Sequence, residues 1–271
     1  MSSPPTMDFS GKCIIVTEGD RGIGLVYSIA LAKAGARVAI IYRSNEDAPQ
    51  VAQDLEKEFR VEVKAYKCDV TNAEQTVEMF EFIAKDLGPV TGLIANPSVS
   101  VVKPVLALTT EHFNHVYNAN VFGVLNSAVA AAKLWKGKNL ENFSIVISST
   151  TSSRIINQAA TNEPLTQVFD NSSKAAVSSL TKGLAAEWAQ AGHNFRVNEV
   201  TPGYGFATPD QIADQALSLL SENASCMTGG GHRVDGAQLI WQIRTTELCG
   251  WSLRGSSSLQ RNVCTQSMHE K

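Results

Sequence analysis

Short apolar runs alternate with longer segments of mixed polarity along most of the chain. The apolar runs cover residues 13–16, 38–42, 61–63, 93–95, 145–147 and 196–200. Runs of this length, with little alternation between apolar and polar positions, are typical of parallel strands that are covered on both faces. The pattern therefore predicts a largely parallel sheet.

The segments between these runs have the length and the apolar spacing of helices. They cover approximately residues 22–34, 47–60, 72–87, 109–135 and 165–191. In the third segment, Val77, Phe80, Ile83 and Leu87 recur at the spacing of one helix face. Regular alternation of strands and helices predicts an α/β fold with a doubly wound parallel sheet and right-handed crossovers. A ligand is expected beyond the carboxyl ends of the strands.

The pattern weakens toward the end of the chain. We expect a single domain over residues 9–241, between an N-terminal arm of residues 1–8 and a C-terminal tail of residues 242–271. The tail has little periodicity, which is typical of loosely packed segments. Alternatively, Leu248, Trp251 and Leu253 fold back over the domain. A chain of 271 residues with 44% hydrophobic residues can bury one full core.

Charge and composition narrow the partners. The net charge is −3 with no basic stripe, which argues against nucleic acid or an anionic membrane and leaves a small molecule as the expected partner. No apolar run approaches the ~20 residues of a membrane span, and the N-terminus lacks a signal-peptide pattern. The five cysteines form no metal-binding pattern, so we expect reduced thiols, no metal site and a cytoplasmic location.

A glycine-rich turn follows the first apolar run and leads into the first helical segment. Residues 17–24 read Thr-Glu-Gly-Asp-Arg-Gly-Ile-Gly. Glycines let the backbone approach a pyrophosphate, and the helix N-terminus supplies unpaired N–H groups and a positive dipole end. We therefore expect Gly19, Arg21, Ile23 and Gly24 to bind a dinucleotide. The alternative is a turn that serves only to close the fold.

The end of the second apolar run indicates which dinucleotide. It reads Tyr42-Arg43-Ser44-Asn45 and contains no acidic residue to accept hydrogen bonds from a ribose diol. Arg43 and Ser44 are suited to hold a 2′-phosphate, with help from Arg21. The predicted cofactor is NADPH (NADP).

Residues 168–174, Val-Phe-Asp-Asn-Ser-Ser-Lys, together with the helical run that follows them, resemble the active-site helix of the short-chain dehydrogenase/reductase family. The family signature there is Tyr-x-x-x-Lys; Lys174 is present, but Asp170 stands where the tyrosine is expected. The resemblance covers roughly residues 9–241 and is closest to fungal NADP-dependent mannitol and sorbose reductases. Two other departures are Glu18, in place of the first glycine of the turn, and Pro97-Ser98, in place of an Ala-Gly pair.

The resemblance implies roles for further residues. At the cofactor, it places Asp69 near the adenine, Asn96 beside the dinucleotide and Lys174 on the nicotinamide ribose. It places Pro202, Gly203 and Thr208 around the nicotinamide end. On the catalytic face, it makes Asn120 a structural or catalytic residue and Thr150 the substrate-binding hydroxyl. It also implies a homo-oligomer, by family resemblance a tetramer. After Thr208 the relatives insert a lid, whereas here residues 209–212 run directly into a helix. We therefore expect a reduced or missing lid and a bulky substrate.

Asp170 changes the expected chemistry. A proton donor worth roughly 10²–10⁴-fold in rate is replaced by a group that stays ionised beside Lys174 and cannot protonate an alkoxide. An iminium cation needs no proton, because hydride converts it directly to a neutral amine, and a carboxylate attracts it. A simpler interpretation is that Asp170 only forms an i,i+4 ion pair with Lys174 on the helix.

Three functional hypotheses follow. The Asp-for-Tyr exchange resembles the fungal indole alkaloid reductase/Diels–Alderases of the malbrancheamide and paraherquamide type, which implies NADPH reduction of an iminium followed by an intramolecular [4+2] cycloaddition controlled by positioning. The second hypothesis is a catalytically degenerate binding or regulatory protein. The third is a polyol or ketose reductase in which another group, such as Thr150, donates the proton.

Overall fold

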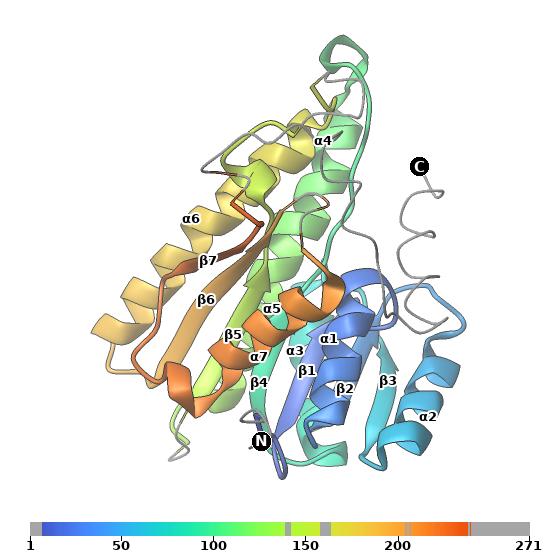
Figure 1. The fold of residues 1–271 in the computed structure, drawn as a ribbon, viewed down its shortest axis with the longest axis vertical. Coiled ribbons are helices and arrows are strands. Elements are labelled where there is room, and N and C mark those ends of the chain that lie inside the picture. Colours follow the sequence, from blue (N-terminus) through green and yellow to red (C-terminus); the bar gives the residue numbers. More distant parts are fainter. Residues whose placement is uncertain are drawn as a thin grey trace.

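The computed structural model describes residues 7–138, 142–157, 164–203, 205, 207–237 and 239. They contain a seven-stranded parallel sheet in the order β3-β2-β1-β4-β5-β6-β7 (Figure 1). The strands are β1 (Cys13–Thr17), β2 (Arg37–Tyr42), β3 (Val63–Lys67), β4 (Val90–Ala95), β5 (Phe143–Ser148), β6 (Phe195–Pro202) and β7 (Gly231–Val234). The strand order reverses between β1 and β4, which confirms the predicted doubly wound sheet.

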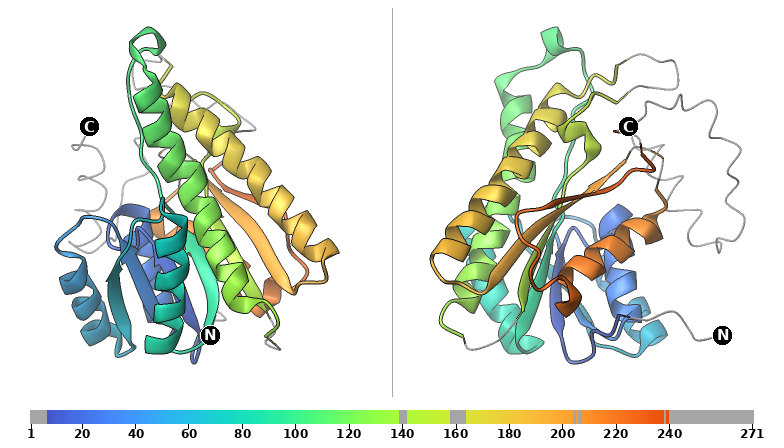
Figure 2. Two further views of the ribbon diagram at one scale, coloured as in Figure 1. Left: turned by 180° about the vertical axis from the view of Figure 1, so that it is seen from behind. Right: turned by 60° about the vertical axis from the view of Figure 1, so that its left-hand side comes forward.

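Helices cover both faces of the sheet. They are α1 (Gly22–Lys33), α2 (Ala48–Phe59), α3 (Ala73–Asp86), α4 (Thr110–Tyr117), α5 (Gly123–Trp135), α6 (Val168–Gln190) and α7 (Pro209–Leu220). Four short elements complete the described part: the 3₁₀ turns η1 (Val105–Ala107), η3 (Thr151–Ser153) and η4 (Glu222–Ala224), and the π-helical turn η2 (Asn118–Phe122). Figures 1 and 2 show α1, α2 and α7 on one face and α3, α5 and α6 on the other.

The apolar core lies in two layers, one on each side of the sheet. Successive strand residues alternate between them: Ile15 and Ile145 pack under α3, α5 and α6, whereas Ile14 and Val146 pack under α1 and α7. Because both faces are buried, the central strands need apolar residues at nearly every position. This explains the continuous apolar runs in the sequence.

The sheet edge departs from the sequence-based prediction. A strand was expected over residues 61–63, but β3 begins at Val63 and ends at Lys67. β3 pairs only with β2, and Lys67 on it is exposed while Val63 and Tyr66 are buried. An edge strand with this mixed pattern does not stand out as a continuous apolar run.

The connection from β6 to α7 is short. Only residues 203–208 separate the two elements. Thr208 caps α7, since its hydroxyl accepts from the Gln211 N–H at 3.3 Å while the Gln211 side chain accepts from the Thr208 N–H at 3.0 Å. Six residues leave no room for a lid helix at this point, in agreement with the reduced lid expected from the sequence.

The predicted terminal segments fall mostly outside the described residues. Residues 1–6 of the expected arm and the whole expected tail, residues 242–271, are not among them. Within the described part of the chain, no helix has the length and apolar character of a membrane span. The same residues contain no group of His, Cys, Asp or Glu side chains arranged to hold a metal ion.

Candidate active site

The glycine turn between β1 and α1 folds so tightly that side chains are excluded at two positions. A Cβ atom added to Gly24 would lie 1.9 Å from the Glu18 carbonyl oxygen, and one added to Gly19 would lie 2.9 Å from the Val16 carbonyl oxygen. Arg21, the N-cap of α1, makes no side-chain capping bond. The turn therefore brings backbone and helix N-terminal N–H groups to a surface that suits a pyrophosphate, and Ile23 is exposed there.

Glu18 takes the conformation of the glycine that it replaces. Its φ angle is +52°, in the left-handed region that favours glycine. Its carboxylate forms an ion pair with Arg21, with 3.0 Å between Glu18 Oε2 and Arg21 Nη2. The negative charge that the sequence places at the turn is therefore offset by a neighbour within the same turn.

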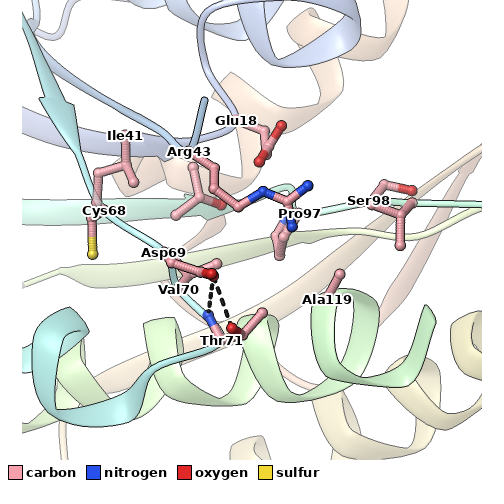
Figure 3. Close-up of a pocket in the computed structure, with 12 residues that line it drawn as sticks. Glu18, Ile41, Arg43, Cys68, Asp69, Val70, Thr71, Pro97, Ser98 and Ala119 are labelled. Carbon is pink, nitrogen blue, oxygen red and sulfur yellow. Dashed lines mark hydrogen bonds between the residues drawn. The ribbon is translucent and has the colours of Figure 1, made fainter. Parts of the chain in front are cut away.

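A pocket opens beside this turn, at the carboxyl ends of β1, β2, β3 and β4. Its lining includes Glu18, Arg43, Asp69 and Pro97, and the Arg43 side chain reaches across it (Figure 3). The Asp69 carboxylate is held in place because its Oδ1 accepts from the Thr71 N–H at 3.0 Å and from the Thr71 hydroxyl at 2.8 Å. The pocket lies at the switch point of the sheet, where such folds bind a nucleotide.

Asn96 and Thr17 tie β4 to β1 at the switch point. The Asn96 N–H donates to the Thr17 hydroxyl at 2.8 Å. The side-chain amide of Asn96 lies against Gly24, since its Nδ2 would be 2.9 Å from an added Cβ there. Ser44, by contrast, is exposed at the end of β2 and is not among the residues that line the pocket.

Sequence analysis missed the structural role of Asp20. The residue is buried, and its Oδ2 accepts from Asn45 Nδ2 at 2.9 Å, which links the glycine turn to the segment after β2. Its other carboxylate oxygen has no hydrogen-bond partner among the described residues. The sequence indicated only another charge near the turn and gave no sign of burial.

Asn120 and Asp170 come together from two helices. Asn120 lies in η2, and its side chain is fully buried. Its Oδ1 accepts from the Val99 N–H at 2.8 Å, and its Nδ2 lies 3.3 Å from Asp170 Oδ1 and 3.0 Å from Ser173 Oγ. The carboxylate of the partly exposed Asp170 thus lies beside the buried Asn120 amide. A π-helical turn within a longer helix is a frequent feature of functional sites.

Lys174 is buried one turn further along α6. Its Nζ donates to the Ser148 carbonyl oxygen at 3.3 Å. Burial lowers the pKa of Lys174, while the negative charges of Asp170 and Glu199 raise it. Of the charges that act on Lys174, that of Asp170 is the larger, so an i,i+4 interaction between the two side chains stays an alternative interpretation of Asp170.

Thr150 lies at the end of β5, where it caps η3. Its hydroxyl accepts from the Ser152 N–H at 3.3 Å and lies 3.5 Å from the Pro202 carbonyl oxygen at the end of β6. Gly203 follows, and its N–H donates to the Val234 carbonyl oxygen at 2.9 Å. The ends of β5, β6 and β7 are therefore joined beside Thr150.

A second buried carboxylate, Glu199 on β6, was also missed. Both its oxygens are buried without a hydrogen-bond partner among the described residues, and Arg154 Nη2 lies 3.7 Å from Oε1. Burial raises the pKa of Glu199. Residues 196–200 were interpreted only as a strand, although a glutamate inside such an apolar run was itself a signal.

Comparisons with known proteins agree with this geometry. The sequence profile described as short chain dehydrogenase matches residues 12–214. An NADP-dependent mannitol dehydrogenase of Alternaria alternata is 34% identical over 197 residues, which cover 72% of this chain and 70% of the relative. A sorbose reductase of Candida albicans is 34% identical over 209 residues, 76% of this chain and 71% of the relative. The expected resemblance to fungal mannitol and sorbose reductases is confirmed.

Solved structures give the same result. A short-chain type dehydrogenase/reductase from Mycobacterium marinum has a TM-score of 0.78 and 30% identity, and the match covers 86% of this chain and 96% of that one. An NADPH-dependent 3-quinuclidinone reductase from Rhodotorula rubra has a TM-score of 0.77 and 26% identity, over 89% and 98% of the two chains. This protein belongs to the short-chain dehydrogenase/reductase family.

Proposed function

We propose that the protein is an NADPH-dependent reductase whose acceptors arrive as cations, such as a cyclic iminium. One observation carries the proposal: Asp170 stands where the tyrosine is expected, and its partly exposed carboxylate lies 3.3 Å from the buried Asn120 amide. An acid that donates a proton is thereby exchanged for an anion that attracts positive charge.

The residues present fit NADP(H). The glycine turn excludes side chains where a pyrophosphate would approach, and Arg43 reaches across the adjoining pocket. Relatives named as NADP-dependent support the same cofactor. The residues that we propose to hold it are Gly19, Arg21, Ile23, Gly24, Arg43, Ser44, Asp69, Asn96, Lys174, Pro202, Gly203 and Thr208. When bound, NADPH supplies a hydride, which reduces a C=N⁺ carbon to a neutral amine without any added proton.

In this proposal, Asn120 and Lys174 keep the Asp170 carboxylate ionised, and that carboxylate attracts the cationic acceptor. The two Asn120 amide hydrogens are shared among the Val99 carbonyl and the Ser173 hydroxyl, each at 3.0 Å, and Asp170 Oδ1 at 3.3 Å. Donation to Asp170 favours the ionised carboxylate. The nearby Lys174 ammonium favours it as well. An ionised Asp170 has no proton to give, but at reduced dielectric it orients and stabilises a cation placed against it. This arrangement disfavours neutral ketones, which need a proton on oxygen.

The entrance supports a bulky, largely apolar acceptor. A bond from the Lys103 N–H to the Thr166 carbonyl oxygen joins the loop after β4 to the segment before α6. Val102 in that loop and Val168, the first residue of α6, are exposed. No lid helix fits between β6 and α7.

We further propose that the protein controls an intramolecular [4+2] cycloaddition after the reduction. The protein would hold diene and dienophile of the reduced product in one folded conformer, which is catalysis by positioning. Its support is the Asp-for-Tyr resemblance and the open entrance alone. A cytoplasmic location, expected from the composition, and a tetramer, expected from the family resemblance, stay predictions.

A polyol or ketose reductase is the second candidate, and the names of the mannitol and sorbose relatives favour it. It requires a proton donor other than Asp170. Thr150 is the available hydroxyl, although it already takes part in the cap of η3. A binding protein without chemistry, suggested by Glu18, Pro97 and Ser98, is less favoured because the Glu18 charge is offset by Arg21.

Single-turnover kinetics test the proposal. Enzyme loaded with NADPH is mixed with a bicyclic iminium salt, and the loss of nicotinamide absorbance is followed. We expect one equivalent of cofactor to be consumed and the rate to fall about 10-fold or more in Asp170→Asn, which keeps the shape but removes the charge. Absence of cofactor oxidation, together with tight NADPH binding, would instead favour the non-catalytic protein.

A further inference from the structure

A second anion lies behind Lys174. Glu199 belongs to β6, and its side chain is 2% exposed. It pairs across the sheet with Ile147 of β5, so its side chain projects to the same face as Ile147, toward α6. A glutamate in this position replaces the apolar residue that the packing of this face would otherwise favour, and burying its charge is costly unless the charge serves another group.

The fold makes room for this carboxylate. A Cβ atom added to Gly231 of β7 would lie 2.6 Å from Glu199 Oε1 and 2.7 Å from Arg154 Nη2. Both charged groups therefore converge over a strand position that has no side chain. The 3.7 Å separation of Glu199 and Arg154 is longer than a hydrogen bond. No well-formed hydrogen bond reaches the carboxylate oxygens from the described residues, but the Ser178 hydroxyl of α6 is near enough to lower the pKa of Glu199.

Lys174 approaches the same place from α6. Its Nζ donates to the Ser148 carbonyl oxygen, and Ser148 pairs with Val200, the neighbour of Glu199 along β6. The Lys174 ammonium uses one of its three hydrogens in this bond. Glu199 and the Ser148 carbonyl that holds Lys174 are thus one pairing position apart in the sheet, and the charge of Glu199 raises the pKa of Lys174.

The charged groups around the pair are few. Arg154 faces Glu199 from the loop after β5, and Lys182 approaches it from α6. Asp170 is the other charged group that acts on Lys174. Tyr27 of α1 bonds to Ser148 Oγ, but burial raises the pKa of its hydroxyl to about 12, so it stays neutral. Within the described residues, Asp170 and Glu199 are the two carboxylates whose charges raise the pKa of Lys174.

We propose that Glu199 is a positioning residue that supplies the counter-charge of Lys174 from behind, and thereby leaves the Asp170 carboxylate for the cationic substrate. The second half of this statement rests on the proposed function, whereas the first does not. Without Glu199, the buried Lys174 ammonium would depend on Asp170 alone. With it, Asp170 can turn its charge toward an incoming cation while Lys174 stays protonated.

The test is the pH dependence of NADPH binding, measured by nucleotide fluorescence without any acceptor. We expect Lys174 to contact the cofactor, so binding should weaken at alkaline pH as this lysine loses its proton. In Glu199→Gln, which is isosteric, the pH of half-maximal weakening should fall by about one unit, because a nearby opposite charge has been removed. Lys174→Met should bind weakly and show no such alkaline transition.

Arg154→Gln is the matched variant, because it breaks the same ion pair from the exposed side. Removing this cation strengthens the attraction between Glu199 and Lys174, so the alkaline transition should move upward. A purely structural ion pair predicts the same response from both variants. An unchanged transition in Glu199→Gln would overturn the proposal; if that variant does not fold, a downward shift or no shift in Arg154→Gln would do so. Failure of iminium reduction would leave this result untouched.

Discussion

Glu18 and Asp170 are both acidic residues at positions where the family signature has a different residue, yet their surroundings differ. Glu18 lies in the cofactor turn in a backbone conformation suited to glycine, and Arg21 in the same turn takes up its charge. Asp170 lies in the first turn of α6, where its carboxylate is 3.3 Å from the Asn120 amide and its charge acts on the buried Lys174. The first change is neutralised locally and leaves the binding frame intact. The second is the change on which the proposed preference for cationic acceptors rests.

Restoring the tyrosine should have the largest effect. Asp170→Tyr returns a proton donor beside Lys174, so we expect turnover of neutral ketoses with NADPH to rise by roughly 10²–10⁴-fold. Steady-state kinetics with fructose and sorbose measure this. Asp170→Phe has the ring without the hydroxyl and should show no such rise. Robust ketose reduction by the wild-type protein would mean that Asp170, like Glu18, leaves the function of its region unchanged.

A side chain at Gly24 should damage the cofactor turn. The added Cβ of Gly24→Ala would overlap the Glu18 carbonyl oxygen, so the turn must open. We expect NADPH binding to weaken by about 10²-fold and stability to fall by about 3 kcal/mol. Calorimetry and thermal unfolding measure the two effects. Gly183→Ala in α6 is the control: its Cβ meets nothing within 4 Å, and it should stabilise the helix by about 1 kcal/mol. Tight binding by Gly24→Ala would show that the turn does not hold the pyrophosphate.

Glycine at position 18 should relieve strain and free Arg21. We expect Glu18→Gly to raise the free energy of unfolding by about 1 kcal/mol and to tighten NADPH binding several-fold. Arg60→Gly is the matched control, because Arg60 ends α2 with a φ angle of +57° far from the cofactor turn. It should gain similar stability with no change in affinity. Equal affinity changes in both variants would mean that the Glu18 charge is irrelevant to binding.

The smallest expected effect is on the pH dependence of stability. Burial raises the pKa of Glu199 above its ordinary value of 4.5, so this group stabilises the fold below pH 4.5 and the contribution is lost as pH rises through its folded-state pKa. Glu199→Gln cannot ionise. Its Tm should match that of the wild type near pH 4.5 and exceed it by about 2 °C at pH 8. A lower Tm at pH 8 would show that the ionised carboxylate stabilises the fold.

The fold could be predicted from the sequence because both faces of the central strands are buried. Continuous apolar runs separated by helical spacing therefore had one simple interpretation. Edge strand β3, with Lys67 exposed, carried a weaker signal and was misplaced by several residues. The glycine turn could also be predicted from the sequence, because the close backbone approach permits only glycine at Gly19 and Gly24.

The catalytic end was harder to predict. Motif spacing identified Asp170 and Lys174, but the direction in which a carboxylate points depends on tertiary contacts such as the π-helical turn that presents Asn120. Burial of Asp20 and Glu199 depends on neighbours distant in the sequence, Asn45 and Gly231. Thr208 was expected at the cofactor, and the structure adds that its hydroxyl caps α7. Local pattern cannot separate such roles, because the same residue types serve both.

The most direct test of the central claim compares two acceptors of the same shape. The ratio of kcat/KM for a bicyclic iminium to that for the isosteric neutral ketone is measured with NADPH, in the wild type and in Asp170→Asn. The account predicts a ratio well above one that falls about 10-fold or more when the charge is removed. A ratio below one in the wild type, or a ratio that Asp170→Asn leaves unchanged, would contradict it.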